Sequence, residues 1–279
     1  MRHEECCVHA ADGYYRASGR MALAICTSGP GATNFTTGIY TANIDSIPLI
    51  AITGQAVRAQ LGKDAFQCVD MVDIARPVAK HVVCLTDPKT AVDEVIKAFK
   101  LAKSGKPGPV LIDFPMDLLK KEFDYPDEDE DVNIRGYKLM GKANESQVKK
   151  VAEAIKGAKK PVILAGGGVV ISDATNEFRK FVKETDIPVV STMMGIGILP
   201  SDNPRYYGMI GSHGVKRANL LFNRADLVIV NGFKDLVTEL LQMSKDLRKA
   251  TKLIHIDLDP AENRQKTLSL IFLLSVILK

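Results

Sequence analysis

Short apolar runs alternate with longer amphipathic stretches through the first part of the chain. Each run is rich in Val, Ile and Leu, is apolar at successive positions and is too short for a helix, which is typical of strands buried on both faces of a parallel sheet. The runs cover residues 21–29, 46–55, 80–85 and 108–115. Between the last two, residues 87–105 repeat apolar positions at helical spacing, with Pro88 near the start and Gly105 at the end. The alternation predicts an α/β fold with right-handed crossovers.

The alternation stops at 116–143 and then restarts. The stretch DYPDEDEDVN (124–133) is acidic and poor in apolar residues, which favours a solvated linker over a metal site. After it, Asn144 is the expected N-cap of a helix. The apolar face of that helix is expected to carry Val148, Val151, Ala152 and Ile155.

The second part of the chain repeats the strand and helix pattern. Strands are expected at 161–168, 188–192, 226–232 and 252–259, and helices at 174–185, at 215–225 and between 232 and 252. We therefore predict two doubly wound, mainly parallel α/β domains, the second with four strands. The expected boundaries are 1–120 and 144–279, with a linker at 121–143.

Composition narrows the class of protein. The 279 residues are 46% hydrophobic and 25% charged, as in a soluble globular protein. The net charge of +4 without a dense basic block argues against nucleic-acid binding. Five cysteines without CxxC spacing favour reduced thiols in the cytoplasm over disulfides or zinc. No signal peptide is expected, and the final run LSLIFLLSVILK is shorter than the ~20 residues of a membrane span.

Three glycine-containing turns carry candidate chemistry, but each is unspecific alone. They are TSGPGATN (27–34), AGGG (165–168) and GSHG (211–214). Glycines let backbone approach a ligand and a helix start offers free N–H groups, yet a plain strand–helix turn has the same features. The lone His213 is more often a capping or packing residue than a catalyst. The sequence contains neither GxGxxG nor HExxH.

The order and spacing of the motifs are far more specific than any one motif. RHEECCVHAADGYYRASGR, CTSGPGATN, ANIDSIPLIAITGQ, GKDAFQCVDMVDIARPVAKH, GKPGPVLIDFP, KKPVILAGGG, STMMGIG, MIGSHG and HIDLDPAE follow one another in this order. From residue 2 to about 262 the chain resembles the acetolactate synthase (acetohydroxyacid synthase) large-subunit family of thiamine-diphosphate enzymes. The resemblance implies a pyrimidine-binding domain followed by a central domain.

The resemblance also implies roles for residues of the first domain. Glu4 would end an early strand, and its carboxylate would bond a ring nitrogen of the thiamine aminopyrimidine, helped by an apolar pocket that keeps it partly protonated. Gln67 would be the second catalytic residue, beside the reacting carbon. The remaining implied contacts are Pro30, Asn34 and Gln55 for the cofactor and Phe66, Lys80 and Lys106 for a 2-keto acid substrate.

For the central domain the resemblance implies FAD, bound without redox use. The matching positions are Gly166, Gly167, Gly168, Thr192, Met193, Gly211, Ser212, His213, Gly232, Asp257 and Leu258. After residue 232 the chain reads GFKDLVTEL, without the arginines that the family places there. In the first domain, we expect Glu4, Pro30, Asn34, Gln55 and Gln67 to converge on one cleft at the carboxyl ends of the strands.

The family also implies Mg²⁺, held with the cofactor's diphosphate by a GDG motif that this sequence lacks. We therefore expect a chain incomplete at both ends, working in branched-chain amino acid biosynthesis with a homo-oligomeric partner or a chain that supplies the missing domain, and inactive alone. Two alternatives stay open. One is a non-catalytic nucleotide-binding or interaction module, and the other is a fragment of a related enzyme such as sulfoacetaldehyde acetyltransferase or pyruvate oxidase.

Overall fold

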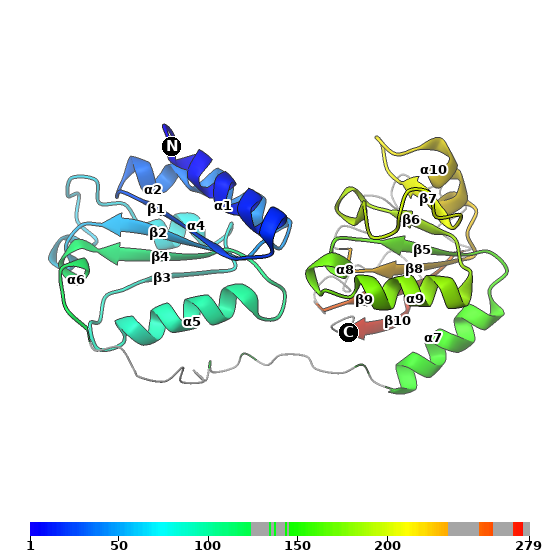
Figure 1. Cartoon of the computed structure of the whole chain (residues 1–279). Helices are drawn as coiled ribbons and strands as arrows, with labels where there is room; N and C mark the ends of the chain where they lie inside the picture. The colour runs from blue at the N-terminus through cyan, green and yellow to red at the C-terminus, as the bar shows by residue number, and fades with distance from the viewer. Residues whose placement is uncertain are drawn as a thin grey trace. The chain divides into compact units, whose positions relative to one another are not determined.

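The computed structural model describes residues 1–123, 134, 137, 143, 145–233, 251–258 and 270–275. The chain divides into two compact units, Met1–Leu139 and Met140–Lys279 (Figure 1). Each unit contains a parallel sheet with helices on it, which confirms the predicted α/β class.

The first unit begins with a helix and contains four strands. Its elements are α1 Glu4–Ser18, β1 Ala22–Cys26, α2 Pro30–Asn34, α3 Thr36–Ile44, β2 Leu49–Gln55, η1 Arg58–Gln60, α4 Met71–Ala75, β3 His81–Cys84, α5 Ala91–Lys103, β4 Val110–Pro115 and α6 Met116–Leu119. The strands pair in parallel in the order β1-β2-β4-β3. All four strands fall within the predicted apolar runs.

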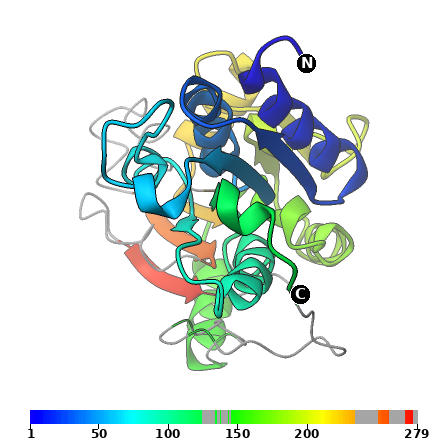
Figure 2. The ribbon, with the colours of Figure 1, turned by 90° about the vertical axis from the view of Figure 1, so that its left-hand side faces the viewer.

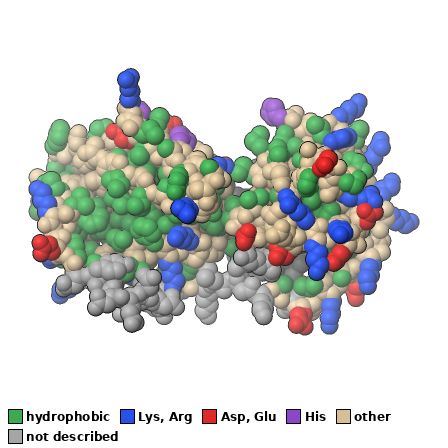
Figure 3. Space-filling model, in the orientation of Figure 1, with side chains coloured by type: hydrophobic (Ala, Val, Ile, Leu, Met, Phe, Trp, Pro, Cys, Tyr) green, Lys and Arg blue, Asp and Glu red, His purple; other side chains and the backbone are tan. Residues whose placement is uncertain are grey.

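Both faces of this sheet are covered, which explains the continuous apolar runs. Because side chains alternate along a strand, Leu49 and Ala51 pack with the buried residues of α1 and α3, whereas Ile50 packs with those of α5. Helices α1 and α5 accordingly lie on opposite faces of the sheet (Figures 1 and 2). The β1 edge is less covered, since Leu23 and Ile25 are exposed, and hydrophobic side chains gather on this unit in Figure 3.

The start of the chain differs from the prediction. Residues Met1–Glu4 were expected to be the end of a strand, but Glu4 is the first residue of α1. His3 caps this helix, because its Nδ1 accepts a hydrogen bond from the Glu5 N–H. Two carboxylates in the first turn also favour a helix start, where the free N–H groups lie.

The second unit has six described strands, so the prediction of four was wrong. Its elements are α7 Glu145–Gly157, β5 Pro161–Ala165, α8 Gly168–Ile171, α9 Thr175–Thr185, β6 Val189–Ser191, η2 Met193–Gly195, β7 Tyr206–Met209, α10 Lys216–Asn223, β8 Leu227–Asn231, β9 Lys252–Asp257 and β10 Leu270–Ser275. They pair in parallel in the order β10-β9-β8-β5-β6-β7. The two strands that the sequence did not indicate, β7 and β10, are the two edges.

Two residues of the predicted linker, 121–143, pack on the first unit. Helix α6, Met116–Leu119, precedes that linker, whereas Ile134 and Tyr137 lie in it and pack against the hydrophobic cluster that contains α5 residues. The Tyr137 hydroxyl donates to the Ser104 carbonyl oxygen at 2.8 Å. The expected cap at Asn144 and the expected helix between 232 and 252 fall mainly outside the described residues.

Candidate functional site

A carboxylate and an amide meet where β1 gives way to α2. The turn after β1 contains Gly29 at φ 63°, a left-handed conformation that suits glycine, and α2 then starts at Pro30. This places Asn34, at the end of α2, beside the start of α1. The Asn34 Nδ2 group donates to Glu4 Oε2 at 3.0 Å. The structure therefore brings the side chains of Glu4 and Asn34 together.

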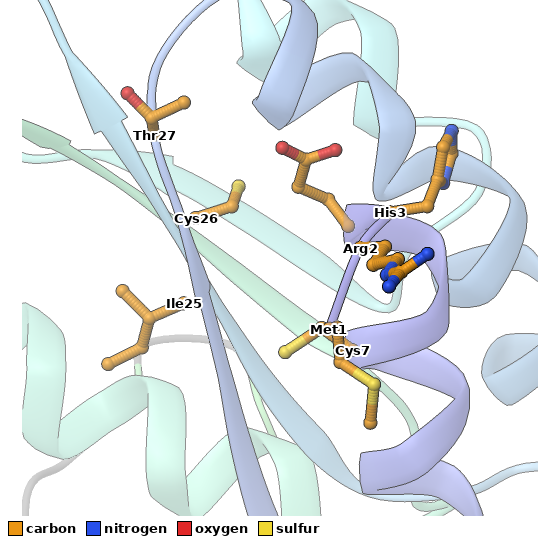
Figure 4. A pocket seen from close by; sticks show the side chains of 8 residues that line it. Met1, Arg2, His3, Cys7, Ile25, Cys26 and Thr27 are labelled. Atoms are coloured by element: carbon orange, nitrogen blue, oxygen red, sulfur yellow. The ribbon is translucent and has the colours of Figure 1, made fainter.

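The Glu4 side chain lies in a small hollow at the same edge, seen in Figure 4. The hollow has a volume of about 230 Å³. It is lined by Met1, Arg2, His3, Glu4, Cys7, Ile25, Cys26 and Thr27. This Glu4 hollow combines one carboxylate, two basic side chains and an apolar wall, which suits a flat, polar, nitrogen-bearing ring.

The electrostatics of the hollow correct one expectation. The pKa of Glu4 is lowered, first by the hydrogen bond from Asn34 and then by a backbone hydrogen bond. The expectation that an apolar pocket keeps Glu4 partly protonated is therefore wrong for this structure. Hydrogen-bond donors to the carboxylate favour its charged form. Burial, with the Glu4 charge as a smaller cause, raises the pKa of Cys26 to about 12, so its thiol stays protonated.

Gln67 reaches the same edge from the segment that follows β2. Its backbone is left-handed, with φ 53°, and its side chain packs over Gly29. A methyl group on Gly29 would lie 2.7 Å from the Gln67 Cβ. Glycine is therefore needed at this position both for its positive φ and for the close approach of Gln67. The Ser28 hydroxyl also donates to Gln67 Oε1 at 3.4 Å. Phe66 beside it is 89% exposed, so its ring is free of the core.

Gln55 lies at this edge but faces inward. Its amide nitrogen donates to Asp113 Oδ2 at 2.8 Å and to the Val69 carbonyl oxygen at 2.7 Å. Its amide oxygen accepts from the Ala56 N–H at 2.8 Å. The side chain is 5% exposed and both of its N–H donors are used inside the protein. The structure therefore separates Gln55 from the open hollow.

Lys80 and Lys106 are not brought to this edge. They precede β3 and β4, so they lie at the amino end of the parallel sheet. Lys80 Nζ donates to the Leu101 carbonyl oxygen and, at 2.6 Å, to the Ser104 carbonyl oxygen, which are at the C-terminus of α5. Burial lowers the pKa of Lys80 to about 8.

The eleven candidate FAD residues all lie at the carboxyl edge of the second sheet, directly after β5, β6, β7, β8 or at the end of β9. The Thr192 hydroxyl is buried there without a hydrogen-bond partner in the described part of the chain. Met193 is 67% exposed, and Ser212 and His213 are also exposed. A buried hydroxyl without a partner, at an edge with both apolar and polar exposed side chains, fits a ligand with polar groups.

The glycines at this edge have a different explanation. A methyl group on Gly166 would lie 2.3 Å from the Gly232 carbonyl oxygen, and one on Gly168 would lie 2.5 Å from the Gly232 Cα. The Gly168 N–H donates to the Gly232 oxygen at 2.9 Å. These glycines therefore let two backbone turns touch, and that space is filled by the protein itself.

The described residues contain neither a candidate metal centre nor a candidate membrane-spanning helix. No group of three or more His, Cys, Asp and Glu side chains there could hold a metal ion. Within the same residues, no helix has the length and apolar character to cross a membrane. All five cysteines are free thiols.

Comparisons with known families match both units. The N-terminal thiamine-pyrophosphate-binding domain of the thiamine pyrophosphate enzymes matches residues 1–74. The central domain of the same enzymes matches residues 148–272. This second match continues into the apolar run at the end of the chain, beyond the point near residue 262 where the motif resemblance stops.

Several curated proteins are similar over nearly the whole chain. A probable acetolactate synthase large subunit of Methanocaldococcus jannaschii is 44% identical over 269 residues, which are 94% of this chain and 44% of the relative. Acetolactate synthase large subunits of Haemophilus influenzae and Cyanidium caldarium are 40% and 41% identical, over 93% and 100% of this chain and 45% and 48% of their own lengths. The chain spans about half the length of the relatives that it matches.

Proposed function

Because the chain belongs to the thiamine pyrophosphate enzyme family, alongside acetolactate synthase large subunits, we propose that Glu4 holds the aminopyrimidine ring of thiamine diphosphate. The proposed activity is that of a carboligase, which joins 2-keto acids by means of thiamine diphosphate. The observation that carries the proposal is the Glu4–Asn34 hydrogen bond at the rim of the hollow beside β1.

In this proposal, the residues of this chain orient the aminopyrimidine ring, and the Glu4 carboxylate accepts a hydrogen bond from one ring nitrogen. Asn34 donates to Glu4 Oε2, and the two carboxylate oxygens together keep further lone pairs that can accept a hydrogen bond from a ring nitrogen. The lowered pKa of Glu4 keeps it an acceptor at neutral pH, and an acceptor selects the ring tautomer that carries hydrogen at that nitrogen. Thiamine diphosphate, when bound, supplies the carbanion chemistry of the 2-keto acid.

The substrate side of the proposal is Gln67 and Phe66. Gln67 stands over the Gly29 turn that leads into α2, and Phe66 offers an exposed ring for the apolar part of a small keto acid. Lys80 and Lys106 are left out of this site, because they lie at the other end of the strands.

Binding of the isolated aminopyrimidine half of thiamine tests the proposal directly. Titrated into the ¹⁵N-labelled chain, it is expected to shift the amide resonances of the Glu4 hollow, at residues 1–7 and 25–34. Glu4→Gln should weaken binding about tenfold or more, the effect of losing a charge-assisted hydrogen bond. Glu5→Gln is the matched control, because Glu5 contacts His3 and His9 and does not line the hollow. Equal binding by wild type and Glu4→Gln would refute the proposal.

Assembly and pathway form the wider part of the proposal. We assign binding of the diphosphate and its Mg²⁺ to a GDG-bearing domain outside these 279 residues, since they contain no GDG motif. The reaction would belong to branched-chain amino acid biosynthesis in the cytoplasm. Acetolactate formation from pyruvate, with thiamine diphosphate and Mg²⁺, is expected only when a GDG-bearing chain is added. Turnover by this chain alone would contradict the assignment.

For the second unit we propose FAD at the carboxyl edge of the sheet, with the Thr192 hydroxyl as one hydrogen-bonding group. Gly166, Gly168 and Gly232 would shape the turns after β5 and β8, and side chains at this edge would make the contacts with FAD. Quenching of flavin fluorescence by the purified chain is the readout. Thr192→Val should weaken it, and Thr185→Val, a substitution at the end of α9, should not.

A further inference from the structure

A buried carboxylate links the two central strands of the first sheet. Asp113 on β4 is 1% exposed, and its oxygens accept from the Thr53 hydroxyl at 2.7 Å and from Gln55 Nε2 at 2.8 Å. These two donors are on β2, and the Cys84 thiol on β3 also hydrogen-bonds the Asp113 carboxylate. Neither the motif resemblance nor the proposed chemistry gives Asp113 a role, and a buried carboxylate is costly to keep.

The network continues from Gln55 into the segment after β2. The second N–H of the Gln55 amide donates to the Val69 carbonyl oxygen at 2.7 Å, which also accepts from the Met71 N–H at 3.0 Å. Because Asp113 and Ala56 fix the rest of this amide, the Val69 carbonyl is held at a set distance from β4.

Val69 lies two residues after Gln67. The left-handed backbone of Gln67 and its packing over Gly29 depend on where the chain enters and leaves this turn. The other end of the segment is anchored at Arg58, whose Nε donates to Asp117 Oδ2 at 2.7 Å and whose Nη1 donates to the Thr86 carbonyl oxygen at 3.0 Å. Between the anchors, most of residues 59–66 are exposed, so Val69 is the inner anchor.

We propose that Asp113 is a positioning residue that, through Gln55 and the Val69 carbonyl, sets the place of Gln67 over the Gly29 turn. Asp113 does not itself touch the hollow. The meaning for catalysis rests on the proposed function, but the geometry can be tested without it.

Hydrogen exchange of the Cys68 amide is the readout, because this N–H donates to the Ala65 carbonyl oxygen within the segment. Gln55→Met keeps the length of the side chain and removes both donors. It should speed exchange at Cys68 by roughly five- to tenfold relative to core amides such as Ile112, as expected for the loss of one hydrogen bond.

Thr53→Val is the matched control. It removes the other donor to Asp113 from the same strand and leaves Gln55 joined to Val69. Both variants should lower the melting temperature, but only Gln55→Met should release Cys68. Equal release by the two variants, or none by Gln55→Met, would overturn the proposal. Gln55→Asn, which is one methylene too short to reach both partners, serves if Gln55→Met does not fold.

A pair of Asp113 substitutions completes the test. Asp113→Asn should keep slow exchange at Cys68, because its amide oxygen still accepts from Gln55 while the Thr53 hydroxyl turns to accept from its amide. Asp113→Leu should release Cys68, and fast exchange in Asp113→Asn would count against the proposal. Aminopyrimidine binding of the Glu4 variants is measured separately, so failure of the proposed function is distinguishable from failure of this network.

Discussion

Asn34 is the residue that fixes the ionisation of Glu4, since its side-chain amide is the largest cause of the lowered pKa. Asn34→Ala removes that donor, so the pKa of Glu4 should rise toward its ordinary value of about 4.3. Titration of the Glu4 carboxyl carbon by NMR measures this. Thr33→Ala is the control on the same helix, because the Thr33 hydroxyl donates only to the Pro30 carbonyl. An unchanged pKa in Asn34→Ala would show that the hydrogen bond does not form in solution.

The raised pKa of Asp113 predicts an unusual dependence of stability on pH. Burial raises its pKa, so the folded state holds the proton more tightly than the unfolded state does. Stability from this group is therefore lost as pH rises from the ordinary aspartate value, about 3.9, through the folded pKa. As pH rises across that window, the free energy of unfolding of the wild-type protein should fall relative to that of Asp113→Asn.

Asp117 provides the opposite sign for comparison. Its pKa is lowered by hydrogen bonds from Arg58, so it adds stability above the ordinary value that is lost as pH falls through the folded pKa. Urea denaturation at a series of pH values measures the free energy of unfolding of Asp113→Asn and of Asp117→Asn. If Asp113→Asn and Asp117→Asn changed the pH dependence in the same direction, the assignment of Asp113 as a raised group would be wrong.

At the scale of elements, the turn after β8 makes one of the close backbone contacts among the described residues of the second unit. Gly232 has φ 60° and lies so close to Gly168 that any side chain would strike backbone. Gly232→Ala should lower the stability of this unit by about 2–4 kcal/mol, from backbone strain plus the steric clash.

Gly157→Ala is the matched control at the end of α7, where an added methyl group meets nothing. It should be neutral or stabilise by up to about 1 kcal/mol, because alanine is the better helix former. Calorimetry of both variants gives the comparison. A Gly232→Ala variant as stable as Gly157→Ala would mean that the two turns do not touch.

Sequence patterns predicted the elements that pack against a core, on both faces in β2 and on one face in α5. The run at 46–55 gave β2 and the helical spacing at 87–105 gave α5, because core packing forces those residue types. Strands β7 and β10 were missed for local reasons. Strand β7 reads YYGM and so forms no apolar run, and β10 lies in the final apolar run, beyond the last motif of the resemblance. The inward turn of Gln55 was also missed, because its partner Asp113 is 58 residues away.

At the scale of the whole chain, each hydrophobic cluster draws its residues from one unit alone. Residues 1–139 expressed alone should therefore fold and unfold cooperatively. A fragment that ends at residue 120 should be less stable by about 1–3 kcal/mol, because it loses the partly buried side chains of Ile134 and Tyr137. Thermal denaturation of the two fragments tests the boundary, and equal stability would place it near residue 120 instead.

The contact between Gly168 and Gly232 has a consequence for evolution. Selection against a clash inside the chain acts on every descendant that keeps the fold, whether or not the proposed ligand binds beside it. A lineage that lost the ligand would drift first at exposed side chains such as Met193 and His213, and last at the glycines. In such lineages the glycine motif records ancestry of the fold, and the side chains around it record whether the ligand is still used.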